Sequence, residues 1–325
     1  MTTGKGTPMS ALRLTLRQLQ VFVAVARAGS TKSAGAEVAL SQSATSSALN
    51  ELERMLSLRL FDRAGKRLLL NDNGRALLPR ALAMLDGAAG IERMALWGTE
   101  QAQTLRIGAS TTLGNYMLPP LLRRFLDVRR IDSAAAWASK VSIGNTAAIC
   151  DAVAEFQLDI GLIEGPCHLA SLAVTPWLQD ELVIVASPAH PAGATHDRLP
   201  VKALREQVWL LREPGSGTRD ATDHLLLPHL RSYRRSIEFA SSEAIKESAA
   251  EGLGVACLSH AVVRDLIELR RLVRVPTTLP RLTRQCYWVV HRDKQPSPAL
   301  REFIERISTV HTVADDPENG RTTRP

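Results

Sequence analysis

The chain has 325 residues, more than one hydrophobic core usually organises, and this length predicts two or three domains. Its composition, with 45% apolar and 22% charged residues, is that of an ordinary globular protein. No apolar run reaches the roughly 18 residues that span a bilayer, and the N-terminus lacks the apolar stretch of a signal peptide. We therefore predict a cytoplasmic protein without a membrane segment.

The net charge of +7 is placed unevenly along the chain. Residues 1–97 hold thirteen Lys and Arg against seven Asp and Glu, so this segment carries six of the seven excess charges. A basic excess confined to one segment favours a polyanionic partner for it, although many basic faces are merely solvated.

Residues 14–39 read as two short helices that meet at a tight turn. An apolar stripe at helical spacing runs along the first helix: Leu16, Leu19, Phe22, Val23 and Ala26. Gly29 is suited to end that helix, and Ser30 can cap a second helix that continues to about Ala39. Residues 1–13 show no apolar periodicity, and we expect them to be disordered.

A third helix, capped by Ser41, has one apolar and one polar side. The apolar side has core spacing and consists of Ala48, Leu49, Leu52, Met55 and Leu56. Short, uncharged polar side chains occupy the other side: Gln42, Ser43, Thr45, Ser46 and Asn50. Such side chains can approach base edges closely, and Gln and Asn can pair bidentately with adenine. The pattern predicts a recognition helix, although taken alone it is also typical of an ordinary capped helix rich in Ser.

The next segment, LRLFDRAGKRLLLND, reads as strand, turn and strand, with the turn at Ala64–Gly65. Its tip carries Arg63, Lys66 and Arg67. A basic two-stranded wing beside a helix-turn-helix is placed to hold phosphates or to enter the minor groove. We predict that these three residues contact DNA, together with Lys32 of the second helix.

A long amphipathic segment runs from Asn71 to about Trp97. Its apolar residues recur at alternating spacings of four and three, as in an a/d seam: Leu77, Ala81, Met84, Ala88, Ile91 and Ala95. The helix can pack on its own domain or on a second copy. Because a helix that joins two domains has little else to cover it, we favour a dimer contact, which would also supply a second DNA-reading head. The predicted dimer residues are Ala81, Met84, Ala88 and Ile91.

Beyond about Gln103, short apolar strands alternate with helices, as in LRIGA, KVSIG, LDIGLIE and ELVIVAS. The segments VWLLR, SIEFA, GVACLS and YWVVH continue the pattern. An α/β region of roughly two hundred residues suits two small lobes with a crevice between them, which is the usual place for a ligand.

The order and spacing of these segments resemble the LysR-type transcriptional regulators over almost the whole chain. The resemblance rests on LRQLQVFVAVARAGS, SQSATSSALNELE, LFDRAGKRLLLNDNGRALLPRA and LRIGAS. It implies a winged helix-turn-helix, a dimerising linker helix, and a two-lobed α/β effector domain like a periplasmic binding protein. It also implies tetramers on interrupted dyad sites in double-stranded DNA, base reading by Gln42, Ser43 and Ser46, and contact with RNA polymerase.

This resemblance sets the expected division of the chain. We expect a disordered N-terminus (1–13), a DNA-binding domain (14–72), a linker helix (73–97), an effector-binding domain (98–312) and a disordered tail (313–325). Within the effector-binding domain, we expect lobe I at about 104–178 and 281–312, and lobe II at about 179–280.

Within the family, LDIGLIEGP, LREPGSGTRD and SSEAIKESAAEGLGVACLS look most like the branch tied to sulfite and cysteine metabolism. Two features depart from the family pattern. Gly35 lies inside the second helix where Ala is usual, and Gly costs about 1 kcal/mol of helix propensity. The stretch 126–142 is several residues longer than in the family and lacks its Tyr-Pro, which can alter the mouth of the crevice.

Small hydrogen-bond donors gather at four strand-to-helix junctions of the α/β region: Ser110, Thr111, Thr112, Asn145, Thr146, Ser216, Thr218 and Ser241. Helix N-termini there present free N–H groups and partial positive charge, which suit a small anion. Each hydroxyl can instead cap its own helix. Because four such junctions surround one crevice, we favour an anionic effector. The family resemblance narrows the identity of this anion to sulfite, sulfate or a sulfur-containing precursor. Glu164 would orient these donors or the backbone, and Arg219 would either supply charge or form an outward salt bridge.

Two other classes of protein fit less well. A secreted solute-binding protein would share the two-lobed domain. It would, however, need an export signal and would not carry residues 14–97. For a hydrolase, Ser216 lacks a GxSxG elbow, no acid completes a triad with His224, and His224 and His229 lack the HExxH spacing. We expect no enzyme activity and no cofactor. The alternative reading is a solute-binding or hydrolytic domain fused to a helix-turn-helix.

The cysteines give no sign of a metal site. Cys150, Cys167, Cys257 and Cys286 are scattered along the chain without a CxxC pair. This spacing predicts reduced structural thiols rather than a metal site or a disulfide framework.

Overall fold

The computed structural model describes residues 13–65, 67–97, 105–128 and 139–309, without the side chains of 93–97 and 126–128. The expectations for residues 1–12, for Lys66, for most of the long stretch 126–142 and for the tail lie outside these residues. The chain divides into two compact units, Met1–Gly98 and Thr99–Pro325. Among the described residues, no helix is long and apolar enough to cross a membrane.

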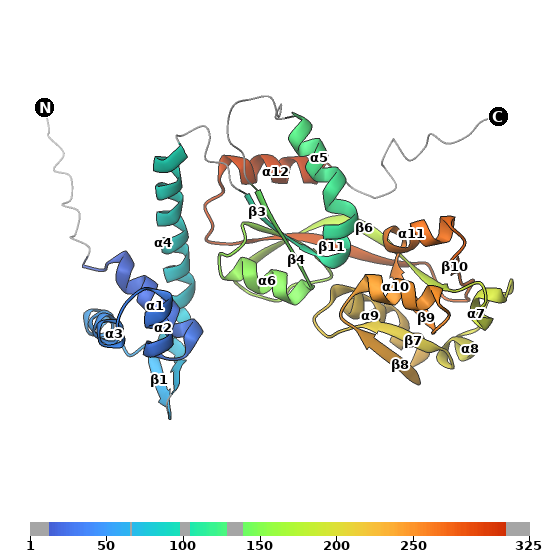
Figure 1. Ribbon diagram of the computed structural model, residues 1–325, viewed down its shortest axis with the longest axis horizontal. Coiled ribbons are helices and arrows are strands. Elements are labelled where there is room, and N and C mark those ends of the chain that lie inside the picture. Colours follow the sequence, from blue (N-terminus) through green and yellow to red (C-terminus); the bar gives the residue numbers. More distant parts are fainter. Residues whose placement is uncertain (1–12, 66, 98–104, 129–138, 310–325) are drawn as a thin grey trace, which may run out of the picture. The chain divides into compact units, whose positions relative to one another are not determined.

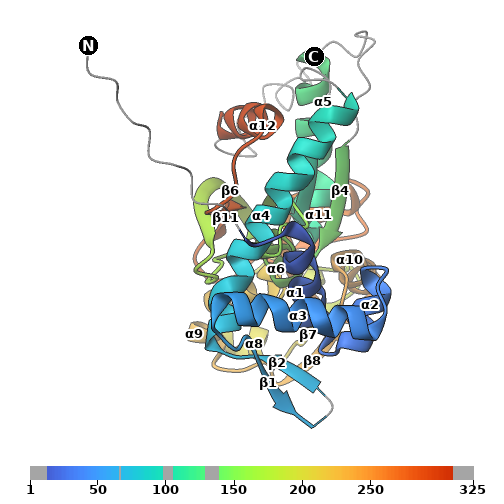
Figure 2. The same ribbon diagram turned by 90° about the vertical axis from the view of Figure 1, so that its left-hand side faces the viewer.

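The first unit holds four helices and a hairpin in its described part: α1 (Leu16–Ala28), α2 (Thr31–Glu37), α3 (Gln42–Leu56), β1 (Phe61–Ala64), β2 (Arg67–Leu70) and α4 (Asp72–Trp97). Local sequence sets the helix ends. Thr15 forms a capping box with Gln18, and the Ser30 and Ser41 hydroxyls accept backbone N–H groups at the starts of α2 and α3. Gly29 ends α1 with φ +67°, as its lack of a Cβ allows. The antiparallel hairpin β1–β2 extends beyond the helices of this unit (Figure 2).

Helix α2 approaches α3 closely at Gly35. A Cβ on Gly35 would lie 2.7 Å from the Leu40 carbonyl oxygen and 2.9 Å from Thr45 Oγ1. The glycine that departs from the family pattern therefore permits this close packing, since any side chain here would displace backbone.

The second unit is an α/β structure built on one mixed sheet (Figure 1). Its strands are β3 (Leu105–Ser110), β4 (Ser139–Gly144), β5 (Ile160–Glu164), β6 (Leu172–Ala186), β7 (Val208–Arg212), β8 (Arg235–Phe239), β9 (Val255–Ser259), β10 (Val273–Arg274) and β11 (Leu282–His291). Its helices are η1 (Leu113–Met117), α5 (Leu118–Val128), α6 (Thr146–Ala154), α7 (Pro191–Ala194), α8 (Val201–Arg205), α9 (Gly217–Leu230), α10 (Ser242–Ala250), α11 (His260–Glu268) and α12 (Pro298–Ser308).

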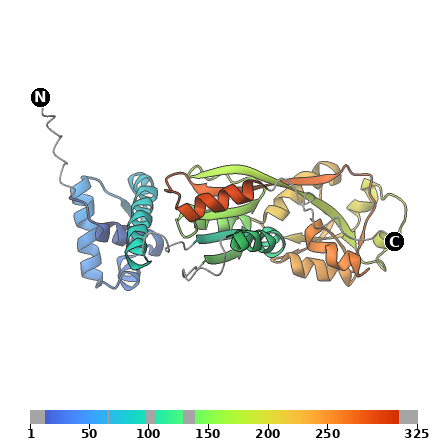
Figure 3. The same ribbon diagram turned by 90° about the horizontal axis from the view of Figure 1, so that it is seen from above.

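Strand order divides this unit into two lobes. The described strands run β4-β3-β5-β11-β6-β9-β7-β8, with β10 paired to β6. Strands β3, β4 and β5 are parallel in the first lobe, and β7, β8 and β9 are parallel in the second. The long antiparallel pair β6 and β11 runs through both lobes (Figure 3), with a register shift between Gln285 and Tyr287 where it passes from one to the other.

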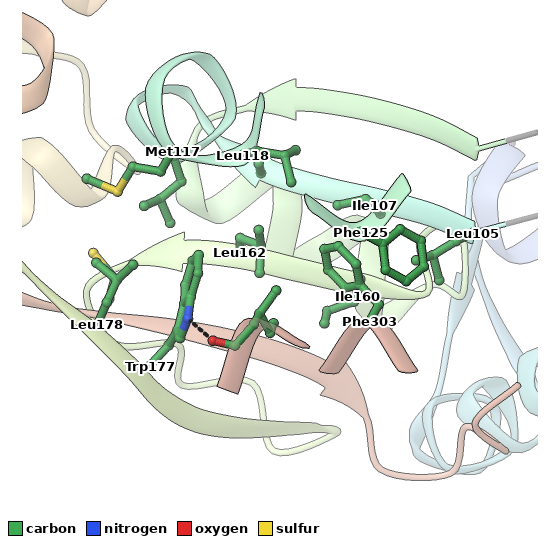
Figure 4. Close-up of a cluster of buried hydrophobic side chains, with 14 of the residues drawn as sticks. Leu105, Ile107, Met117, Leu118, Phe125, Ile160, Leu162, Trp177, Leu178 and Phe303 are labelled. Carbon is green, nitrogen blue, oxygen red and sulfur yellow. Dashed lines mark hydrogen bonds between the residues drawn. The ribbon is translucent and has the colours of Figure 1, made fainter. Parts of the chain in front are cut away.

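Each lobe buries apolar residues on both faces of its strands. In the first lobe, α5 and α12 cover one face and α6 covers the other. Phe125 and Phe303 meet edge to face at 5.4 Å, and Trp177 Nε1 donates to the Ile307 carbonyl at 2.7 Å (Figure 4). In the second lobe, α7, α8 and α9 lie on one face, and α10 and α11 on the other. Both lobes are thus three-layered, and the carboxyl ends of their parallel strands hold the predicted donor junctions.

Candidate functional site

Helix α3 presents part of the predicted base-reading surface. Gln42, Ser43 and Asn50 are exposed, and Ser46 is half-buried. Thr45 does not fit its predicted DNA contact, because its side chain is fully buried against α2 and its hydroxyl donates to the Ser41 carbonyl at 2.9 Å. Thr45 and Ser46 are adjacent residues, about 100° apart around the helix, so one lies in the core and the other nearer the surface. The polar character of Thr concealed that difference.

The basic residues predicted to hold phosphates lie on the surface of the first unit. Arg63 and Arg67 are exposed on β1 and β2, and Lys32 is exposed on α2. Lys66, between the two strands, is not among the described residues. The hairpin and the start of α3 therefore supply exposed cations and exposed neutral polar groups within one unit.

Helix α4 carries the predicted apolar seam only in part. Met84 is 47% exposed, Ile91 is 69% exposed, and Ala88 is half-buried. Ala81 is fully buried within the first unit, so its predicted place in a dimer contact is wrong. Helix α4 thus buries Ala81 within its own unit, whereas Met84 and Ile91 remain exposed.

In the second unit, the predicted donors converge on Glu164 at the end of β5. Its carboxylate accepts from Ser110 Oγ at 2.9 Å, from the Thr112 backbone N–H at 3.1 Å and from Thr218 Oγ1 at 2.8 Å. Ser110 and Thr112 belong to the first lobe, whereas Thr218 opens α9 of the second. Three of the predicted donors from two lobes are therefore engaged by a carboxylate of the protein itself.

Arg284 of β11 supplies the charge that this buried carboxylate needs. Its Nη1 donates to Glu164 Oε2 at 2.7 Å, and its Nε donates to Asp180 Oδ2 of β6 at 2.8 Å. Burial alone would raise the pKa of Glu164, but the Arg284 guanidinium and hydrogen bonds from Thr218, Thr112 and Ser110 outweigh it and lower that pKa. Burial raises the pKa of Asp180 against the attraction of Arg284.

The lobes also touch through the turn before α9. The Gly215 carbonyl accepts from the Ala147 N–H at 3.1 Å, and the Gly217 N–H donates to Thr146 Oγ1 at 3.2 Å. A Cβ on Gly217 would overlap the Glu164 carbonyl oxygen. Only glycine allows the start of α9 to pack so close to the end of β5.

A second ion pair lies at the same junction. Arg212, the last residue of β7, donates from Nε to Glu213 Oε2 at 2.7 Å and from Nη1 to Ser242 Oγ at 2.8 Å. Glu213 Oε1 accepts from Asn145 Nδ2 of the first lobe at 3.3 Å. Burial would raise the pKa of Glu213, but its hydrogen bonds, chiefly to Arg212, outweigh burial and lower it.

The other predicted residues have mixed roles. Thr111 Oγ1 donates to the Gly144 carbonyl, Asn145 caps α6, and Ser241 caps α10. Ser216 precedes α9, is 2% exposed, and makes no capping hydrogen bond with its side chain. Arg219 pairs with Asp223 and Glu238, which is the outward arrangement.

The described residues contain no group of three His, Cys, Asp or Glu side chains that could hold a metal ion. The four cysteines form no disulfide. Cys150 and Cys167 lie together, since a hydrogen bond with the neighbouring Cys167 adds to burial in raising the pKa of Cys150.

Two family models match nearly the whole chain. The lysR-family bacterial regulatory helix-turn-helix matches residues 16–75, and the LysR substrate binding domain matches residues 98–311. The chain belongs to the LysR-type transcriptional regulators. It is a DNA-binding regulator with an effector-binding domain and not an enzyme, and LysR-type regulators bind DNA and small molecules, typically as oligomers.

Among its relatives, the LysR-type regulator is 44% identical to the HTH-type transcriptional regulator YeiE of Escherichia coli (strain K12), covering 90% of this chain and 97% of YeiE. It is 32% identical to CysL of Bacillus subtilis (strain 168), over 77% of this chain and 82% of CysL. Its fold is similar to that of a full-length OxyR variant from Pseudomonas aeruginosa (TM-score 0.65, 22% identity, 92% and 95% of the two chains). It is also similar to ArgP from Mycobacterium tuberculosis (TM-score 0.68, 18% identity, 91% and 97%). Both structures share the winged helix-turn-helix and two-lobed α/β architecture.

Sequence reasoning missed the charged partners of this LysR-type regulator. Arg284 interrupts the otherwise apolar and neutral strand LTRQCYWVV, and Arg212 ends the apolar strand VWLLR. A single cation in a buried strand needs an anion nearby, so Arg284 and Arg212 could each have predicted a buried ion pair.

Proposed function

We propose that this LysR-type regulator reads DNA bases through Gln42, Ser43 and Ser46, with Asn50 further along the same helix. Lys32, Arg63, Lys66 and Arg67 hold phosphates beside it. The support is the exposed, uncharged start of α3 within the same unit as the exposed cations of the hairpin. The functional division of the chain is into 14–72 for DNA, 73–97 for dimerisation and 98–312 for the effector.

The regulator works as a dimer through Met84, Ala88 and Ile91 of α4, and as a tetramer on interrupted dyad sites. The support is the uncovered apolar surface of α4, since 47% of Met84 and 69% of Ile91 would otherwise stay in water. It acts in the cytoplasm, where promoters and RNA polymerase are available to a DNA-binding regulator.

Its effector is a small oxyanion bound where the two lobes meet, of the kind used in sulfur metabolism. The carrying observation is the convergence of donors from both lobes at the carboxyl ends of β3, β4, β5 and β7. Because Glu164 already engages Ser110, Thr112 and Thr218, and Thr111 Oγ1 donates to the Gly144 carbonyl, the effector meets Asn145, Ser216 and Ser241. The resemblance to the sulfite and cysteine branch narrows the anion toward sulfur chemistry.

Calorimetric titration of the full chain with sulfite, sulfate, thiosulfate, phosphate and O-acetylserine tests this proposal. Sulfur anions should bind, and Ser216→Ala should weaken them because it removes a buried donor. Thr195→Val is the control, since Thr195 caps an exposed turn of the second lobe. Indifference to every anion at millimolar concentration would reject the effector class, and binding that Ser216→Ala leaves unchanged would show that the site lies elsewhere.

A further inference from the structure

Arg212 carries a positive charge that is almost sealed from water. Its side chain is 2% exposed, at the carboxyl end of β7. Nε and Nη2 donate to the two carboxylate oxygens of Glu213 at 2.7 and 2.9 Å, and Nη1 donates to Ser242 Oγ at 2.8 Å. Since a buried guanidinium without an anion is strongly disfavoured, this position always needs one.

Glu213 provides that anion from a more exposed place. Its side chain is 20% exposed, ten times the exposed fraction of its partner. It reaches across the lobes, because Oε1 also accepts from Asn145 Nδ2 at the start of α6. Glu164, by contrast, is 2% exposed and is held by Ser110, Thr112, Thr218 and Arg284 together.

The two carboxylates therefore differ in how readily an outside anion can replace them. Glu164 is sealed and fully bonded, whereas Glu213 faces water with one cation and one amide as partners. Ser216, in the same turn, is buried yet makes no capping hydrogen bond with α9. An anion that took the place of the Glu213 carboxylate would find the Arg212 guanidinium and the Asn145 amide ready to donate.

We propose that Glu213 is a built-in competitor of the effector, and that an oxyanion binds by displacing the Glu213 carboxylate from Arg212 and Asn145. This inference rests on the proposed anionic effector and assigns its charge partner to Arg212 rather than to Arg219. Displacement removes one contact between the lobes and substitutes the anion's own contacts. The occupied and unoccupied states thereby differ at the lobe junction, as a ligand-driven shift between states requires.

The test removes the competitor and keeps the cation. Sodium sulfate and sodium sulfite are titrated into the full chain by calorimetry, and thermal midpoints are measured over the same concentrations. The variants are Glu213→Gln, the double variant Arg212→Gln/Glu213→Gln, and Glu206→Gln. Glu206 pairs with Arg234 on the surface of the same lobe, where the two side chains are 48% and 63% exposed. Glu206→Gln thus removes an equal charge from a place where no site is proposed.

Glu213→Gln should bind sulfate about tenfold more tightly than the wild type, and its thermal midpoint should rise with sulfate more than that of Glu206→Gln. The double variant should lose both effects. Glu213→Asp, which retracts the carboxylate but keeps its charge, should fall between the wild type and Glu213→Gln, and it gives a second reading if the glutamine variant folds poorly.

The outcomes separate this inference from the proposed function. If the wild type binds sulfite and the double variant binds it equally well, the effector class stands and the Arg212 site is wrong. If only Glu213→Gln binds the anions, the competitor is real and the proposed sulfur effector is wrong. If Glu213→Gln binds no more tightly than the wild type, the competitor role is overturned.

Discussion

Arg284 Nη1 lies 2.7 Å from Glu164 Oε2, and the two side chains are 3% and 2% exposed. The same guanidinium lies 2.7 Å from Asp180 Oδ2 through Nη2. Glu164 ends a strand of the first lobe, while Arg284 and Asp180 are cross-strand partners on the pair that runs through both lobes. One cation thus holds two buried carboxylates where the lobes join.

Arg284→Leu should destabilise the second unit by about 3–5 kcal/mol, because it leaves two buried carboxylates without a cation. Urea unfolding followed by tryptophan fluorescence measures this, since Trp177, Trp209 and Trp288 all lie in that unit. Arg271→Leu is the control. Arg271 pairs with Glu247 and Glu251 at 45% exposure, and its loss should cost less than about 1 kcal/mol. Equal costs for the two variants would contradict a structural role for Arg284.

His190 should make the stability of the second unit depend on pH. Burial lowers the pKa of its imidazole from the ordinary value of 6.5, and Nδ1 accepts from the Ala192 N–H at 3.1 Å. Protonation therefore favours the unfolded chain. The stabilisation is fully present above pH 6.5 and is lost as the pH falls through the lower folded-state pKa.

His190→Asn keeps a capping acceptor that does not titrate, so it should lose less stability than the wild type between pH 7.5 and 5. Urea unfolding at several pH values measures the difference. His224→Asn is the control for replacing an exposed imidazole with asparagine. A His190→Asn slope equal to that of the wild type would show that the cap does not titrate.

Two positions in α2 and α3 show how much of the fold can be predicted from the sequence. Periodicity and capping residues predicted both helices because these signals are local. The tight contact between Gly35 and Thr45 was not predictable, because it depends on how two helices approach each other in space. The same limit explains the second unit: small donors at strand ends and a donor-orienting role for Glu164 were predicted, but Arg284, which pairs with Glu164, comes from a strand distant in sequence.

Gly35→Ala should destabilise the first unit, although Ala is the better helix former. The gain in helix propensity is about 1 kcal/mol, whereas forcing a Cβ against the Leu40 carbonyl oxygen costs about 1–3 kcal/mol of overpacking. Ala36→Gly, at an exposed position of the same helix, measures the propensity alone. Thermal unfolding followed by circular dichroism compares them, and a Gly35→Ala variant more stable than the wild type would show that α2 can move away from α3.

Gln42→Ala and Arg63→Ala should weaken DNA binding in different ways. Gln42→Ala should cost about 1–3 kcal/mol on the cognate operator and little on random DNA, because its amide reads a base edge. Arg63→Ala should weaken both and lower the salt dependence, because it loses a phosphate contact. Fluorescence anisotropy at several salt concentrations separates the two effects. Wild-type affinity of Gln42→Ala for the operator at matched salt would rule out its base-reading role.

Ile91→Asp should dissociate the dimer, because it places an unpaired charge in the apolar seam of α4. The single chain offers a matched control, since Leu269 of the second unit has the same 69% exposure as Ile91. Leu269→Asp adds the same charge to a surface with no proposed partner. Light scattering should give a lower mass for Ile91→Asp and the wild-type mass for Leu269→Asp. Operator affinity should fall in parallel for Ile91→Asp alone, because a monomer presents one reading head to a two-half site. If Ile91→Asp keeps both the wild-type mass and the wild-type affinity, then Met84 and Ile91 face water in the working regulator and dimerisation lies elsewhere.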